Sequence, residues 1–148
     1  MAKKKTVAII GAGVSGLAAA KVFKEKGHEI SVFERSHDLG GVWEPSRSYP
    51  GIQTQSPKDL YRYTEKAMPD RYPEWPSGAE VHAYLGSYAD DHDLGAAISF
   101  GADVVSLARR PDGEPGWRLH ISRGDGFQPR RTLILLRSVR ANSARRTP

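Results

Sequence analysis

The stretch that most constrains the fold is G-A-G-V-S-G at residues 11–16, which stands between an apolar segment and a helical pattern. Residues 6–11 are apolar and β-branched without alternation, as in a parallel strand that is covered on both faces. Residues 11–27 continue with one apolar and one charged face, and Gly27 is placed to end a helix. Residues 28–35 have the composition of a second strand. The sequence therefore predicts a βαβ unit of about thirty residues.

The three glycines of this stretch indicate a specific ligand chemistry. Gly11 allows a tight turn, Gly13 lets a pyrophosphate approach the backbone, and Gly16 lets the helix pack closely on the strand. The helix N-terminus offers free N–H groups to phosphate oxygens. Glu34, at the end of the second strand, can accept hydrogen bonds from ribose hydroxyls. Because this carboxylate would repel a 2′-phosphate, the pattern predicts a dinucleotide site that disfavours NADP.

A long loop and two helices are predicted next. Residues 36–56 are rich in glycine, proline and serine without periodicity, which is typical of a binding loop. Ser56 and Ser77 each occupy the position of a helix N-cap, with an acidic residue three positions later. We therefore expect one helix to begin at each serine.

Four further segments have the composition of strands: 96–100, 103–110, 117–122 and 132–136. The second and third flank a turn that is rich in glycine and proline, as in a β-hairpin. The expected fold class is α/β, with a Rossmann-like βαβ core, a late β-hairpin and an incomplete parallel sheet.

The positive charge of the chain is concentrated at its end. Residues 1–128 hold sixteen Lys and Arg against seventeen Asp and Glu, whereas residues 129–148 hold six arginines and no acid. The net charge of +5 therefore belongs to this tail, which also lacks the interleaved aromatics of single-strand binders. We expect no nucleic-acid partner. The domain prediction is a partial dinucleotide-binding domain over 1–128 and a disordered tail over 129–148.

Composition also argues against several other classes of protein. The chain has no cysteine, and its five histidines are scattered without the spacing of metal ligands, so no metal site is expected. The basic start and the apolar run after it imitate a signal peptide. However, charged residues between Lys21 and Lys26 continue the helical register, and the apolar run is too short to cross a bilayer. We expect no membrane segment and a cytoplasmic protein.

Residues 34–51, E-R-S-H-D-L-G-G-V-W-E-P-S-R-S-Y-P-G, add a second glycine motif and an indole. Together with the first glycine motif, L-G-G-V-W resembles flavin-dependent monooxygenases of the flavin-containing and Baeyer–Villiger types. In those enzymes this Gly-Gly-x-Trp lies along the flavin. The resemblance extends over roughly residues 6–126, which corresponds to the first third or less of such an enzyme.

The resemblance implies FAD as the cofactor of an FAD-binding domain. Glu34 would hold the adenosine ribose, Trp43 would lie on the path to the flavin, and the backbone of Val104 would meet the adenine. Gln55 stands where the flavin-containing members place an asparagine near the reactive flavin edge, so it is the one candidate catalytic residue. The residues expected to bind the cofactor are Gly11, Gly13, Ser15, Gly16, Glu34, Arg35, Leu39, Gly41, Trp43, Thr54 and Val104.

The implied reaction is reduction of FAD by NADPH, followed by oxygenation of nitrogen or sulfur in a small molecule. This sequence holds one Gly-x-Gly-x-x-Gly motif, whereas the family also uses a second motif for NADPH. Three interpretations stay open: a self-sufficient enzyme, a truncated FAD-binding segment that is inactive alone, or a dinucleotide-binding module without catalysis. The NAD-binding half of a dehydrogenase is a further alternative. We expect the truncated segment, with a tail that is translated out of frame or mis-spliced.

Overall fold

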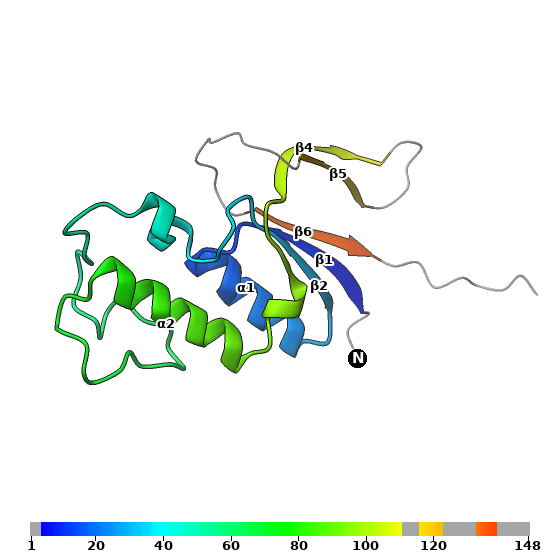
Figure 1. Ribbon diagram of the computed structural model, residues 1–148. Helices are drawn as coiled ribbons and strands as arrows, with labels where there is room; N and C mark the ends of the chain where they lie inside the picture. The colour runs from blue at the N-terminus through cyan, green and yellow to red at the C-terminus, as the bar shows by residue number, and fades with distance from the viewer. Residues whose placement is uncertain (1–3, 111–115, 123–132, 139–148) are drawn as a thin grey trace, which may run out of the picture.

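The computed structural model describes residues 4–110, 116–122 and 133–138. Helices and strands alternate in the first half of the chain, and the second half is richer in strands (Figure 1). The α-helices and strands, in chain order, are β1 (Lys5–Ile10), α1 (Val14–Glu25), β2 (Glu29–Phe33), α2 (Gly78–Asp91), β3 (Ile98–Ser99), β4 (Asp103–Arg109), β5 (Trp117–Ser122) and β6 (Leu133–Ser138). Three short 3-10 helices occur at η1 (Gly41–Trp43), η2 (Pro45–Arg47) and η3 (Gly95–Ala97).

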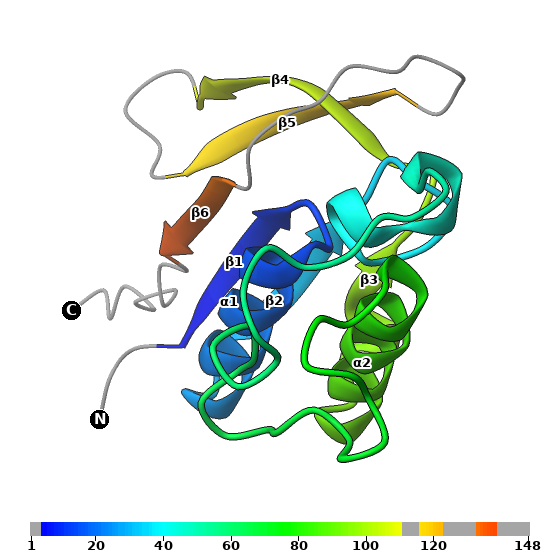
Figure 2. The same cartoon turned by 90° about the vertical axis from the view of Figure 1, so that its left-hand side faces the viewer.

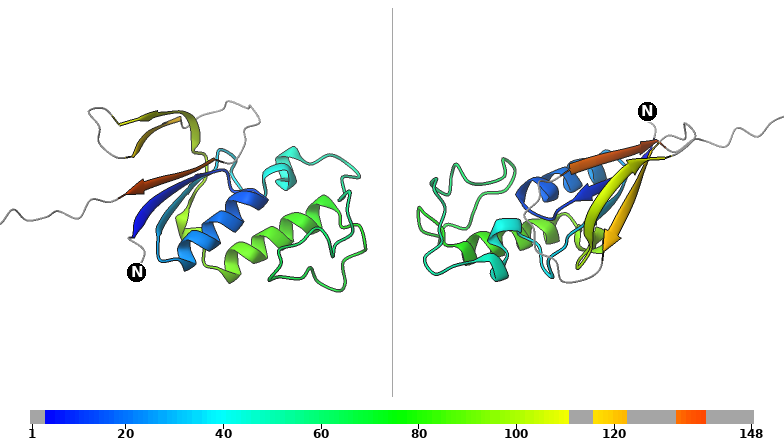
Figure 3. Two further views of the ribbon diagram at one scale, coloured as in Figure 1. Left: turned by 180° about the vertical axis from the view of Figure 1, so that it is seen from behind. Right: turned by 90° about the horizontal axis from the view of Figure 1, so that it is seen from above.

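A four-stranded sheet in the order β3-β2-β1-β6 forms the centre of the molecule. β1 pairs in parallel with β2, β2 pairs in parallel with β3, and β6 pairs antiparallel with β1. Both α-helices cover one face of this sheet, and the β4–β5 hairpin lies over the other (Figures 1 and 2). The same layers are visible from behind and from above in Figure 3. The predicted α/β class, with its βαβ core and late hairpin, is confirmed.

The sequence pattern of β1 and α1 explains the core between sheet and helix. Val7 and Ile9 of β1 are fully buried, as is Val32 of β2. They belong to one hydrophobic cluster with Leu17 and Ala20 of α1, which are also fully buried. Fully burying one aliphatic side chain of this size contributes about 1.5–3 kcal/mol. The βαβ unit is therefore held together by packing, and its loops at the carboxyl ends of the strands are left to bind a ligand.

The helix predicted from Ser77 is confirmed as α2. The Ser77 hydroxyl accepts a hydrogen bond from the Glu80 N–H at 3.3 Å, and a Glu80 carboxylate oxygen accepts one from the Ser77 N–H at 2.8 Å. This reciprocal capping box satisfies two N–H groups that would otherwise lack a partner at the helix start.

The prediction that a helix begins at Ser56 is wrong. Leu60 and Tyr61 both donate their N–H to the Pro57 carbonyl, which closes a single turn that does not continue. The Tyr63 N–H instead donates to the Tyr84 hydroxyl at 2.8 Å. The segment contacts α2 through its tyrosines, so tertiary contacts prevail over the local capping signal.

The predicted strands of the second half differ in length from those observed. The 103–110 and 117–122 segments form the β4–β5 hairpin as expected. The 96–100 strand is reduced to the two residues of β3, because η3 takes up the residues before it. The strand expected at 132–136 is present as β6, which pairs with all of β1, although it lies in the segment for which disorder was also expected. The rest of 129–148 lies outside the described residues.

A cluster of tyrosines joins the loop before α2 to both helices. The Tyr63 ring stacks on Tyr88 with centroids 3.7 Å apart and on Tyr84 at 5.9 Å. The Tyr63 hydroxyl donates to the Val14 carbonyl at 2.7 Å, and the Tyr88 hydroxyl donates to the Glu65 carboxylate at 2.8 Å. Burial raises the pKa of Tyr63, Tyr84 and Tyr88 above their usual value, since the phenolate form would lose its water.

This cluster predicts a loss of stability in alkaline solution. The folded chain keeps three phenolic protons at a pH where the unfolded chain releases them, so the free energy of unfolding falls as pH rises above about 10. Each such proton contributes a slope of up to about 1.4 kcal/mol per pH unit. Urea denaturation from pH 9 to 11 should show a steeper decline for the native chain than for Tyr63→Phe. Equal slopes would contradict the account.

None of the helices in the described part of the chain has the length and apolarity that crossing a bilayer requires.

Candidate functional site

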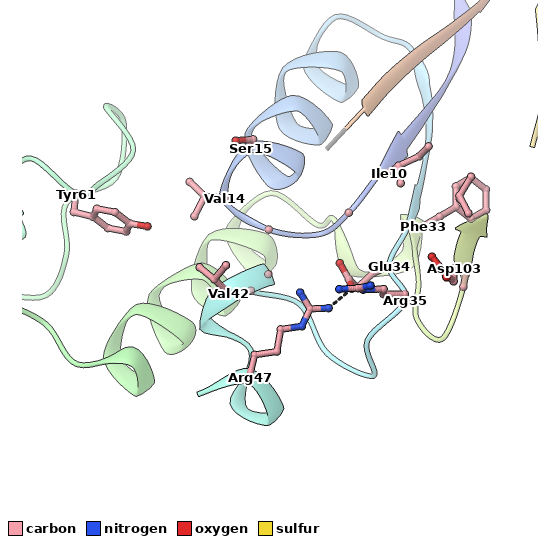
Figure 4. A pocket seen from close by; sticks show the side chains of 16 residues that line it. Ile10, Val14, Ser15, Phe33, Glu34, Arg35, Val42, Arg47, Tyr61 and Asp103 are labelled. Atoms are coloured by element: carbon pink, nitrogen blue, oxygen red, sulfur yellow. Dashed lines mark ion pairs between the residues drawn. The ribbon is translucent and has the colours of Figure 1, made fainter. Parts of the chain in front are cut away.

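A cavity of about 370 Å³ lies where β1 and β2 end and α1 begins. Open parallel sheets bind ligands at this place, because the loops that follow the strands meet there. Figure 4 shows the side chains around it, with Arg35 and Asp103 at one end and Tyr61 at the other. The predicted site residues that line it are Gly11, Gly13, Ser15, Glu34, Arg35, Gly41 and Val104.

The first wall of the cavity is the glycine turn between β1 and α1. Gly11 has a φ of +97°, which favours glycine, and its N–H donates to the Phe33 carbonyl at 2.8 Å. A Cβ on Gly16 would stand 1.9 Å from the Gly11 carbonyl oxygen, so a larger residue cannot be placed there without moving the turn. Gly13 is the N-cap of α1 and has no side chain that could cap the helix. The first N–H groups of α1 are therefore available to a ligand.

The second wall is the glycine turn at Gly40 and Gly41. The Gly40 N–H donates to the Ala12 carbonyl at 2.9 Å, which ties this turn to the first one. A Cβ on Gly41 would lie 3.1 Å from the Gly13 Cα. The two glycine turns thus lie against each other without intervening side chains, and both expose backbone to the cavity. Such a backbone-lined cradle suits a pyrophosphate, which needs N–H donors and close approach.

Glu34 ties the first glycine turn to the chain that leaves β2. Its side chain is almost fully buried; one oxygen accepts the Ala12 N–H at 2.8 Å and the other accepts the Ser36 N–H at 2.8 Å. The predicted role of Glu34 is to bind a ribose; its two hydrogen bonds to backbone N–H groups add an anchoring role. Because a carboxylate has about four acceptor positions, these two bonds leave room for ribose hydroxyls.

Two arginines face the same end of the cavity as Glu34. The Arg47 guanidinium donates to the Ser36 hydroxyl at 2.7 Å and lies 4.0 Å from a Glu34 carboxylate oxygen (Figure 4). Arg47 and Tyr61 were not among the predicted site residues. Both lie on the irregular chain between β2 and α2, whose path no periodicity specifies. Glu34 and Asp103 also line this end of the cavity, so the two arginines are balanced by two carboxylates.

Several predicted residues do not line the cavity. Gly16 lies beneath the first turn, and Leu39 packs against the hydrophobic core. Trp43 is buried and donates its indole N–H to the Tyr61 hydroxyl at 2.9 Å, so it reaches the cavity indirectly. Thr54 is buried, and its hydroxyl has no hydrogen-bond partner among the described residues, while Gln55 is exposed to solvent. The roles of these residues toward a cofactor stay predictions.

The groups that line the cavity are suited to binding a ligand. Backbone of the two glycine turns lines its middle, and Glu34, Arg35, Arg47 and Asp103 stand at one end. Within residues 4–110, 116–122 and 133–138, no group of three His, Cys, Asp or Glu side chains could hold a metal ion. A ligand with phosphates in its middle and a ribose at one end fits this distribution of donors and acceptors.

Comparison of the chain with known sequences is consistent with this geometry. A family model described as flavin-binding monooxygenase-like matches residues 4–125. Flavin-containing monooxygenase 1 of Rattus norvegicus is 40% identical over 116 residues, which is 73% of this chain and 22% of that protein. Flavin-containing monooxygenase 5 of Homo sapiens is 36% identical over 117 residues, or 74% of this chain and 22% of that protein. The chain thus spans about a fifth of the length of these relatives.

Solved structures share the fold. A steroid monooxygenase bound to NADP superimposes with a TM-score of 0.72 at 29% identity, covering 81% of this chain and 24% of that one. The S-allyl-L-cysteine S-oxygenase from Allium sativum gives the same TM-score at 23% identity, over 89% of this chain and 35% of that one, which shows the fold alone. The resemblance noted in the sequence is confirmed over nearly the same residues. The chain belongs to the flavin-binding monooxygenase-like family.

Proposed function

We propose that this chain binds FAD between its two glycine turns, as the cofactor-binding segment of an FAD- and NADPH-dependent monooxygenase. The whole protein would oxygenate nitrogen or sulfur in small molecules. The observation that carries the proposal is the direct contact of Gly13 with Gly41, which makes a backbone cradle beside a buried acid in a chain of this family. The alternative of a dehydrogenase half is disfavoured by the family match.

From one end of the cavity to the other, the described residues match successive parts of FAD. The N–H groups at the start of α1, with Ser15 beside them, would hold the pyrophosphate. Glu34 would accept hydrogen bonds from the adenosine ribose, with Arg35 next to it, and the backbone at Val104 would meet the adenine. When bound, FAD supplies the redox chemistry that protein side chains lack. The protein side chains bind and orient the cofactor and exclude water.

The domain that does this would comprise residues 1–128. The family match ends at residue 125, close to the boundary at which the arginine-rich segment begins. The chain holds a single Gly-x-Gly-x-x-Gly motif, and the cavity described here accounts for it. A second nucleotide site for NADPH would require sequence that these 148 residues do not contain.

Nucleotide selectivity tests the proposal through Glu34. Thermal stabilisation of the chain should be half-maximal at a lower concentration of FAD than of NAD⁺, and NADP⁺ should be weaker than NAD⁺ by about tenfold. The comparison of NAD⁺ with NADP⁺ isolates the 2′-phosphate, which the buried carboxylate of Glu34 repels. Equal stabilisation by NAD⁺ and NADP⁺ would show that Glu34 does not face the ribose.

A further inference from the structure

The second glycine turn is supported from behind by α2. The imidazole of His82, on the first half of α2, lies against Gly40: a Cβ on that glycine would be 3.0 Å from the His82 Cδ2. The His82 Nε2 is 3.1 Å from the Asp38 Oδ2. The other oxygen of Asp38 accepts the Leu39 N–H at 2.7 Å. The side chain of Asp38 therefore links the backbone of the turn to the helix.

The contact between His82 and Asp38 is shielded from water at the imidazole. The His82 Nε2 has no accessible surface and no aligned hydrogen bond within the part of the chain that the structure describes. The Asp38 carboxylate oxygen at 3.1 Å is therefore the polar compensation that the described residues offer this nitrogen. Breaking this contact would leave a buried polar atom without compensation.

The helix that carries His82 is well fixed. Its start is closed by the Ser77 and Glu80 capping box, and its face toward the core includes the fully buried Val81 and Tyr88. A side chain on such a helix is a stable point of attachment. The turn at Gly40, in contrast, has positive φ angles at two successive glycines, which contribute no side chains of their own to the packing.

We propose that His82 is a positioning residue for the cofactor site: through Asp38 and Gly40 it holds the second glycine turn against the first. This inference rests on the proposed binding of FAD. His82 is not among the residues that line the cavity, so it acts on the ligand only through the turn. The turn contacts the first one through the Gly40 N–H and through Gly41, and both contacts shape the cradle.

Substitutions at His82 and Asp38 test this role by flavin fluorescence. We expect His82→Leu to weaken FAD binding about tenfold, the change that a loss of about 1.4 kcal/mol produces. His82→Gln keeps an N–H near the Nε2 position and should bind within about threefold of the native chain. Asp38→Ala removes the same contact and also the acceptor of the Leu39 N–H, so it should weaken binding at least as much as His82→Leu. His37→Gln, at an exposed position in the same loop, is the control and should bind like the native chain.

A measurement in the absence of FAD tests the role of His82 independently of the proposed function. Amide hydrogen exchange at Gly40 reports its bond to the Ala12 carbonyl. Exchange should be about tenfold faster in His82→Leu and Asp38→Ala and unchanged in His82→Gln and His37→Gln. If the native chain does not bind FAD, the proposed function fails, and Gly40 exchange alone decides the role of His82. Unchanged exchange in His82→Leu, or equal loss in His82→Gln, overturns the inference.

Discussion

Replacement of Gly16 by alanine should lower the free energy of unfolding by about 3 kcal/mol and remove FAD binding. The added methyl group would lie 1.9 Å from the Gly11 carbonyl oxygen, a distance that no rotation of a side chain can relieve. Relief requires the glycine turn to move away from α1. Because this turn forms the first wall of the cavity, the same displacement disturbs both stability and ligand binding.

The matched control is Gly86→Ala in α2. A Cβ there would meet no atom within 4 Å, so the substitution adds helix propensity without a clash and should stabilise the chain by about 0.5–1 kcal/mol. Urea denaturation gives the two stabilities, and flavin fluorescence gives the two affinities. If Gly16→Ala binds FAD as well as Gly86→Ala does, the close packing of the turn is not required for the site.

Replacement of Glu34 by glutamine should weaken FAD binding at least about tenfold and destabilise the folded chain by about 2 kcal/mol. Each carboxylate oxygen accepts one backbone N–H, from Ala12 and from Ser36. In glutamine, an NH₂ group replaces one of these oxygens. Its N–H donor would then face a backbone N–H donor, and neither would have an acceptor. The first glycine turn then loses its tie to the chain after β2, and the proposed ribose contact loses an acceptor.

Glu29→Gln provides the same change of charge and size at the start of β2, the strand that Glu34 follows. Glu29 is exposed, and its hydroxyl partner Thr6 can donate equally well to an amide oxygen. We expect its stability and FAD affinity to remain within about 0.5 kcal/mol of the native values. Equal effects at Glu34 and Glu29 would mean that net charge, and not the buried contacts, governs binding.

Local sequence patterns predicted correctly those elements in which the apolar pattern and the turn or capping residues indicate the same structure. β1 and α1 combine an apolar run, three glycines and an amphipathic face, and the structure shows the expected buried core. The signal at Ser56 was equally good locally, but Tyr63 and its neighbours pack against α2 and leave room for only one helical turn. Capping chemistry marks where a helix can start, whereas tertiary contacts decide whether it continues.

The candidate site likewise contains some residues whose position could be predicted from the sequence and others whose position could not. Gly11, Gly13 and Glu34 belong to one short motif, so their shared position at the cavity could be predicted from spacing. Arg47 reaches Glu34 across an irregular loop, and His82 of α2, more than forty residues further along the chain, reaches Gly40. These contacts depend on how the loop folds back over the sheet, which no periodicity or motif encodes.

Titration of the purified chain with FAD, followed by quenching of flavin fluorescence, tests the central claim most directly. We predict saturable binding of one FAD per chain, displacement by ADP, which shares the adenosine and pyrophosphate, and no displacement by riboflavin. The backbone cradle between Gly13 and Gly41 requires this pattern, because it recognises the phosphates and not the flavin ring. A chain that is folded by circular dichroism but shows no saturable quenching would contradict the account.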